Sequence, residues 1–150
     1  MRRRTLSPTL IFILILLLFL FSTSFAFAQV QTRVRVVYAS NVGAIIDPLL
    51  GDLHNQLRSV FSFTSYRLLG DVSIILIGNN PIEVFVHRGR SIELALVEKH
   101  RDMAEMKIMM RMKEVPILNT QVRLSSGKTV FIGGPLYEEG AAIIALSANF

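Results

Sequence analysis

The sequence predicts a mainly β fold with one helix (α+β), arranged as an antiparallel sandwich or a partly closed sheet of about seven to eight strands. Two observations carry this prediction. Apolar and polar residues alternate in short segments that are separated by Gly, Pro, Asn and Ser, which is the pattern of strands and turns. One stretch after residue 47 instead repeats its apolar residues at helical spacing.

The N-terminus has the three parts of a secretory signal peptide. Three arginines begin the chain, an unbroken apolar run extends from Leu10 to Phe21, and the segment closes on the small residues of Ala26-Phe27-Ala28. A signal peptidase cuts after such small residues. The pattern therefore predicts cleavage after Ala28.

This prediction divides the chain into a signal peptide, residues 1–28, and a single β-rich exported domain, residues 29–150, which is periplasmic or extracellular. The alternative is an inner-membrane anchor formed by residues 10–28, because this stretch is about long enough to span the hydrocarbon core of a bilayer. If the leader is cleaved, we expect the domain to have no further contact with the membrane.

Composition narrows the classes of function. Removing the three leader arginines lowers the net charge from +5 to +2, so the sequence predicts no nucleic-acid binding, which requires a concentrated basic face. The chain has no cysteine, so it has neither disulfides nor the lipidated cysteine of a lipoprotein. We therefore expect packing alone to hold the fold together.

The first expected elements are a strand and a helix. Thr32 to Tyr38 alternates Val34, Val36 and Tyr38 with two arginines, which predicts a half-buried strand. Asp47-Pro48 then has the features of a helix start, with Asp47 as N-cap and proline at the first helical position. An apolar stripe follows and predicts a packed helix that ends before Tyr66; its members are Leu49, Leu50, Leu53, Leu57 and Val60 or Phe61.

Strand patterns dominate from Tyr66 onward. Val72 to Ile77 is a β-branched apolar run that ends in the turn sequence 78–81. Residues 82–86 and 92–96 both alternate around Arg88-Gly89-Arg90, which predicts a hairpin.

The segment Ala104 to Met112 is ambiguous, since its Met, Ala, Glu and Lys residues also favour helix. Its period of two favours a strand with Met106, Ile108, Met110 and Met112 on one buried face. The last expected strands are 117–124, 128–132 and 141–147.

Gly127-Lys128-Thr129 matches the end of a phosphate-binding loop, but Val122 stands where that motif has its first glycine. A strand pattern follows the lysine, whereas the motif requires a helix. The sequence therefore predicts a hairpin turn with Lys128 in solvent.

Residues Asn119 to Gly134 (NTQVRLSSGKTVFIGG) resemble a strand–turn–strand in the C-terminal β-domain of secretins, the outer-membrane pore proteins, which carry similar Asn-Thr, Gly-x-Thr and Gly-Gly patterns. The chain departs from that family at Pro135 and is too short to be a complete secretin. Ser65 to Leu69 and the closing Gly-Gly-Pro also resemble small uncharacterised exported bacterial proteins, a likeness that implies no activity. The secretin resemblance implies a setting in a secretion or pilus system.

A metal site is the alternative function. Five of the six methionines lie between Met103 and Met112, and thioethers are soft ligands for copper(I). His100, Met103 and Met106 form the candidate set for a periplasmic copper(I)-binding protein, whereas in a strand these methionines serve as core fillers.

No arrangement of residues indicates catalysis. Glu138 and Glu139 are adjacent, so on a strand they face opposite sides and cannot share acid–base work; a solvated turn is the better interpretation. We therefore expect a non-enzymatic exported domain without a cofactor, which binds an envelope or secretion-system protein or forms a homo-oligomer.

Overall fold

The computed structural model describes residues 8–9, 12–13, 15, 28–86 and 89–150. The predicted signal peptide, residues 1–28, therefore lies almost entirely outside the described residues. Within the described ranges, no helix has the length and apolar character needed to cross a membrane.

The described part of the chain is mostly strand, as the sequence predicts. Two short helical segments, η1 (Pro48–Leu50) and α2 (His54–Val60), lie between the first two strands. The strands are β1 (Gln29–Ser40), β2 (Ser65–Ile77), β3 (Ile82–Val86), β4 (Arg90–Lys99), β5 (Met103–Met112), β6 (Val115–Ser125), β7 (Thr129–Tyr137) and β8 (Gly140–Asn149).

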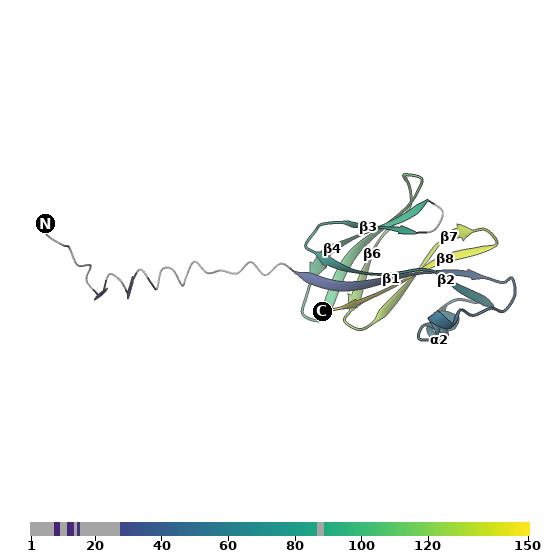
Figure 1. The fold of residues 1–150 in the computed structure, drawn as a ribbon, viewed down its shortest axis with the longest axis horizontal. Helices are drawn as coiled ribbons and strands as arrows, with labels where there is room; N and C mark the ends of the chain where they lie inside the picture. Colours follow the sequence, from purple (N-terminus) through teal and green to yellow (C-terminus); the bar gives the residue numbers. More distant parts are fainter. Residues whose placement is uncertain (1–7, 10–11, 14, 16–27, 87–88) are drawn as a thin grey trace.

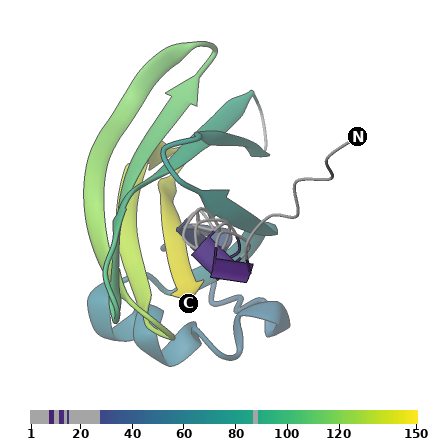
Figure 2. The same cartoon turned by 90° about the vertical axis from the view of Figure 1, so that its left-hand side faces the viewer.

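The strands form two antiparallel sheets that face each other (Figures 1 and 2). Sheet A has the order β2-β1-β8-β7, and sheet B has the order β3-β4-β5-β6. Consecutive strands pair throughout, except where the chain passes from β2 to β3 and from β6 to β7. The fold is thus an up-and-down sheet that closes between β1 and β8 and is split in two places, which confirms the prediction of a sandwich or partly closed sheet.

The main core fills the space between the sheets. Alternate residues of β1 and β8 face inward, and β4 and β5 supply most of the opposite side. The fully or almost fully buried members include Val34, Leu76, Leu94, Leu96, Met106, Ile108, Met110, Leu124, Ile144 and Leu146. Burial of these side chains is the principal stabilising term of the fold, at about 25 cal/mol per Å² of apolar surface.

The strand interpretation of Ala104 to Met112 is confirmed, because β5 pairs with β4 and β6 along this segment. The prediction that Met112 is buried is wrong: its side chain is 40% exposed. Met112 is the last residue of β5, and the turn at Lys113 and Glu114, both with positive φ, carries the chain away from the core.

The prediction of a single helix after Asp47 is also wrong in part. Only three residues after Asp47 form a 3-10 turn, and the α-helix starts anew at His54. Gly51 follows the turn, and its N–H bonds back to the Pro48 carbonyl three residues earlier, which is the tighter pattern of a 3-10 helix. Leu50, Leu53 and Leu57 are buried as predicted, whereas Leu49 and Val60 are exposed.

The turn at Gly127 differs from the predicted hairpin. Residues 126–128 join β6 to β7, but these strands pair with β5 and β8 in different sheets. The turn therefore carries the chain from sheet B to sheet A. Lys128 is exposed, and a strand rather than a helix follows it, as the sequence predicts. The predicted hairpin of residues 82–96 is confirmed by the pairing of β3 with β4.

Candidate functional site: the open face and free edge of sheet A

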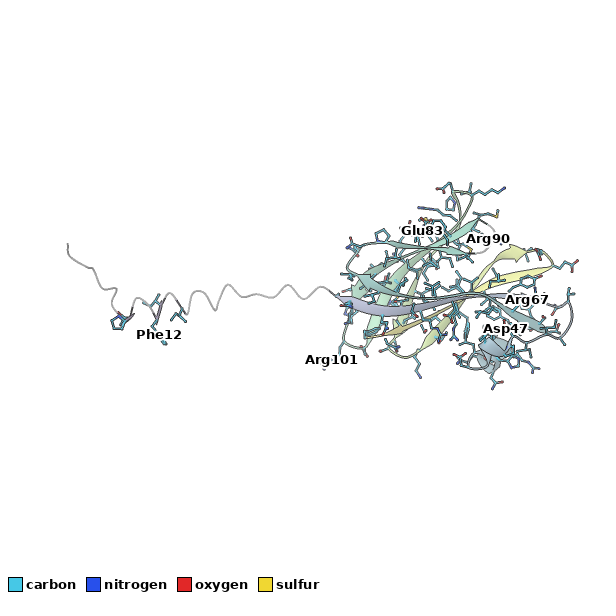
Figure 3. All side chains as sticks on the ribbon, in the orientation of Figure 1. Phe12, Asp47, Arg67, Glu83, Arg90 and Arg101 are labelled. Carbon is cyan, nitrogen blue, oxygen red and sulfur yellow. The ribbon has the colours of Figure 1, made fainter. Side chains whose placement is uncertain are left out.

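The outer face of sheet A is covered along only part of its length. Leu50, Leu53 and Leu57 of the helical segments pack on this face in a second apolar cluster, against Val37, Ala39, Tyr66, Ile143 and Ala145. Asp47 and α2 lie at the end of the molecule away from the C-terminus, whereas Arg101 lies at the other end (Figure 3). The remaining outer surface of sheet A is uncovered. It carries polar side chains on β1 and β8, and β2 adds the exposed Ile75 and Ile77.

Arg35 lies at the boundary between the covered and uncovered parts. Its position on β1 points it to the outer face, and the residue is only 4% exposed. Its Nη1 donates to both carboxylate oxygens of Asp52, each at 2.8 Å. Asp52 follows Gly51 in the break between the two helical segments, so this break brings the carboxylate to the buried guanidinium.

Arg33 lies two residues before Arg35 on the same face of β1. Its Nε and Nη2 donate to the two carboxylate oxygens of Asp71 on β2, at 2.8 and 2.5 Å. The hydrogen bond from Arg33 lowers the pKa of Asp71, and the same bond raises the pKa of Arg33. The Arg33 guanidinium and the Asp71 carboxylate are therefore both charged at neutral pH. The guanidinium groups of Arg33 and Arg35 thus lie next to each other on β1.

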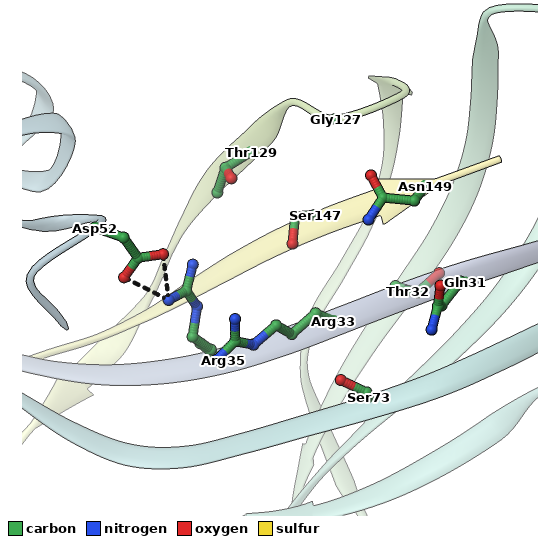
Figure 4. A pocket seen from close by; sticks show the side chains of 10 residues that line it. All are labelled: Gln31, Thr32, Arg33, Arg35, Asp52, Ser73, Gly127, Thr129, Ser147 and Asn149. Carbon is green, nitrogen blue, oxygen red and sulfur yellow. Dashed lines mark hydrogen bonds and ion pairs between the residues drawn. The ribbon is translucent and has the colours of Figure 1, made fainter. Parts of the chain in front are cut away.

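A polar pocket of about 300 Å³, here called the arginine pocket, opens on this surface (Figure 4). Strands β1, β2, β7 and β8, the turn before β7 and the break between the helical segments all contribute to it. Its lining consists of Gln31, Thr32, Arg33, Arg35, Asp52, Ser73, Gly127, Thr129, Ser147 and Asn149. Hydroxyl, amide and guanidinium groups predominate, so the pocket suits a polar ligand.

The edge of sheet A at β2 has two different halves. Near its start, the chain segment before η1 runs alongside β2: the N–H of Tyr66 donates to the Ile45 carbonyl at 2.8 Å, and the N–H of Asp47 donates to the Tyr66 carbonyl at 2.9 Å. The Asp47 side chain accepts from the N–H groups of Leu49 and Leu68. Asp47 therefore both caps the 3-10 turn and helps to cover this half of the β2 edge.

The second half, Gly70 to Ile77, has no strand on its outer side among the described residues. We call it the free stretch of β2. It carries the exposed apolar side chains of Val72, Ile75 and Ile77, of which Ile75 is 46% exposed. Asp71 is its only charged residue, and Arg33 already neutralises that charge.

The other three edges carry features that hinder the addition of a further strand. Strand β3 has only five residues. Strand β6 contains Pro116 and a register shift beside it, and the pairing of β7 with β8 is irregular around Gly134-Pro135. The free stretch of β2 is therefore the edge best suited to pair with a strand from a partner.

The structure brings two of the three predicted copper ligands close: the N–H of His100 donates to the Met103 carbonyl at 2.7 Å across the turn between β4 and β5, whereas Met106 is held apart from them. His100 lies in the exposed turn after β4, with its Nε2 3.3 Å from Glu98. Met103 and Met106 lie on opposite faces of β5, and Met106 is fully buried in the core between the sheets. Copper binding by this set requires Met106 to leave the core, and no described group of three His, Asp or Glu side chains is placed to hold a metal.

Glu138 and Glu139 lie in the exposed turn between β7 and β8, as predicted. Together with Tyr38, Ser40 and Arg67 they line a second pocket, at the end of the molecule that carries the helical segments. Tyr38 and Arg67 contribute from β1 and β2.

The Arg35–Asp52 pair could not be predicted from the sequence. The alternation of apolar and polar residues in the first strand predicted only that Arg33 and Arg35 share its solvent-exposed face. Nothing in the spacing of residues relates Arg35 to a residue in the helical region. The free stretch of β2 had a signal, the continuous apolar run of residues 72–77, but such a run also fits a strand covered on both faces. No protein-family model, curated protein or solved structure matches the chain.

Proposed function

We propose that this protein is a non-enzymatic, exported binding domain that holds another envelope protein by pairing the free stretch of β2 with a strand of that partner. The observation that carries the proposal is the contrast among the four sheet edges. Three of them carry features against pairing. The free stretch of β2 is eight residues long, and it presents three exposed apolar side chains and one neutralised charge.

Strand addition suits this edge for physical reasons. A partner strand would bond to main-chain groups along β2, and its side chains would contact those of Val72, Ile75 and Ile77. Natural sheets usually protect such edges with charge, proline or a covering segment. Here the segment around Ile46 covers only the first half of the edge, which favours a binding role for the second half.

The resemblance of residues 119–134 to secretins directs the search for the partner to a secretion or pilus system. In the structure these residues form the end of β6, the turn and most of β7. Strand β7 is the edge of sheet A opposite β2, so this segment is separate from the proposed interface.

A photo-crosslinking amino acid at position 75 in the producing cell tests the proposal. We expect it to yield a defined adduct with one envelope protein, identified by mass spectrometry, and Ile77→Lys to abolish that adduct by placing a charge on the edge. The same crosslinker at Leu136, an exposed apolar residue on the opposite edge, is the matched control.

The proposal fails if position 75 yields no adduct, or the same adducts as position 136. An adduct with a second copy of the chain would show that the free stretch of β2 forms a homo-oligomer instead of binding an envelope protein.

A further inference from the structure

We propose that the arginine pocket binds a small oxyanion that carries hydroxyl groups, of the class of sugar acids and sugar phosphates. This inference goes beyond the proposed function and does not depend on it. The pocket uses side chains on the outer face of sheet A, Ser73 of the free stretch among them, whereas strand pairing uses the main-chain edge of β2. Three observations support it: the charge of the lining, the position of Arg35, and the chemistry of the remaining side chains.

The lining carries two positive groups and one negative group. Arg33 and Arg35 lie on the same face of β1, two residues apart, and Asp52 is the one carboxylate that lines the pocket. Asp71 neutralises Arg33 from β2 but does not line the pocket. Each guanidinium already has a carboxylate partner, so an oxyanion would be favoured over a neutral ligand by charge-assisted hydrogen bonds from the two arginines rather than by relief of repulsion between them.

Burial and the ion pair with Asp52 hold the side chain of Arg35 in one position. Only 4% of Arg35 is exposed. The side chain of its partner Asp52, in contrast, is 58% exposed. Both bonds to Asp52 use Nη1, and Figure 4 shows the guanidinium beside that carboxylate at one end of the pocket. A planar guanidinium fixed in this way presents further N–H donors to an oxyanion with little loss of side-chain entropy.

The rest of the lining matches hydroxyl groups. Ser73, Thr129 and Ser147 supply hydroxyls, and Gln31 and Asn149 supply amides, so each residue both donates and accepts hydrogen bonds. These five residues come from all four strands of sheet A. The absence of aromatic and large apolar side chains from the lining argues against a lipid, and the volume of about 300 Å³ suits a compound the size of a single sugar.

Calorimetric titration of the full-length chain in mild detergent tests the inference with four probes: glucuronate, glucose 6-phosphate, inorganic phosphate and glucose. We expect the two hydroxylated anions to bind, and both glucose and inorganic phosphate to bind about tenfold more weakly or worse. If glucuronate alone binds, the ligand is a sugar acid; if glucose 6-phosphate alone binds, it is a sugar phosphate.

Arg33→Gln and Arg123→Gln form a matched pair of variants. Each removes an exposed arginine whose Nε donates to a carboxylate, Asp71 at 2.8 Å or Glu105 at 2.9 Å, but only Arg33 lines the pocket. We expect Arg33→Gln to weaken binding about tenfold and Arg123→Gln to leave it unchanged. Equal weakening by both variants would show general charge attraction and overturn the site.

Binding of no probe to the folded wild-type chain also overturns the inference, as does binding of inorganic phosphate as tight as that of glucose 6-phosphate. Neither result affects the crosslinking test of the proposed function, which depends on the main-chain edge of β2 and not on the arginine pocket.

Discussion

Met109 and Met110 are adjacent in sequence and lie in opposite environments. Met110 is almost fully buried between the sheets, whereas Met109 lies on the outer face of sheet B, in register with Glu93 of β4. Because successive residues of a strand face opposite sides, the same substitution at these two positions isolates the effect of burial.

We expect Met110→Lys to lower the free energy of unfolding by several kcal/mol, because an unpaired ammonium would be buried. Met109→Lys should be nearly neutral, since the new amine would reach solvent and the carboxylate of Glu93. Met112→Lys should also be tolerated, given the exposure of Met112. Thermal and chemical denaturation measure the differences, and a mild effect at Met110 would contradict the core position of its side chain.

At the scale of elements, the helical segments and sheet A form a second packed layer. Leu57 is fully buried against sheet A, while Val60, three residues later in α2, is exposed. This pair provides a test of the layer within one short helix.

We predict that Leu57→Ala lowers the free energy of unfolding by about 2–5 kcal/mol, through lost burial and the cavity left behind. Val60→Ala should change it by less than about 0.5 kcal/mol. Urea denaturation of both variants gives the comparison. If the two losses were equal and small, α2 would not pack on the sheet.

Most elements were predictable because their signals are local. Alternation set the strands and their buried faces, and Asp47-Pro48 marked the start of the helical region; its cap is confirmed by the hydrogen bond from Leu49. The break at Gly51 was not predictable, since the apolar stripe continues across it. The Arg35–Asp52 contact and the free stretch of β2 depend on which segments meet in space, and that information is not contained in the spacing of residues.

At the scale of the whole molecule, the first described strand begins where the predicted leader ends. Gln29 is the first residue of β1, and the carbonyl of Ala28 accepts a hydrogen bond from the N–H of Gly78. Cleavage after Ala28 would therefore remove this one hydrogen bond but leave all eight strands in place.

We predict that the exported protein begins at Gln29 and is found outside the cytoplasm. Mass spectrometry of the N-terminus after cell fractionation measures both properties. A chain that keeps Met1 or Arg2 and stays in the membrane fraction would support the anchor formed by residues 10–28 instead.

The pairing of β1 with β8 has a consequence for how the chain is made. Gln31 of β1 lies opposite Asn149 of β8, so β1 must wait for the synthesis of residues 140–149 before sheet A can be completed. Contacts between such distant residues slow folding. We therefore expect the ladder between β1 and β8 to form late in folding, after the pairs of sheet B, whose strands are neighbours in sequence.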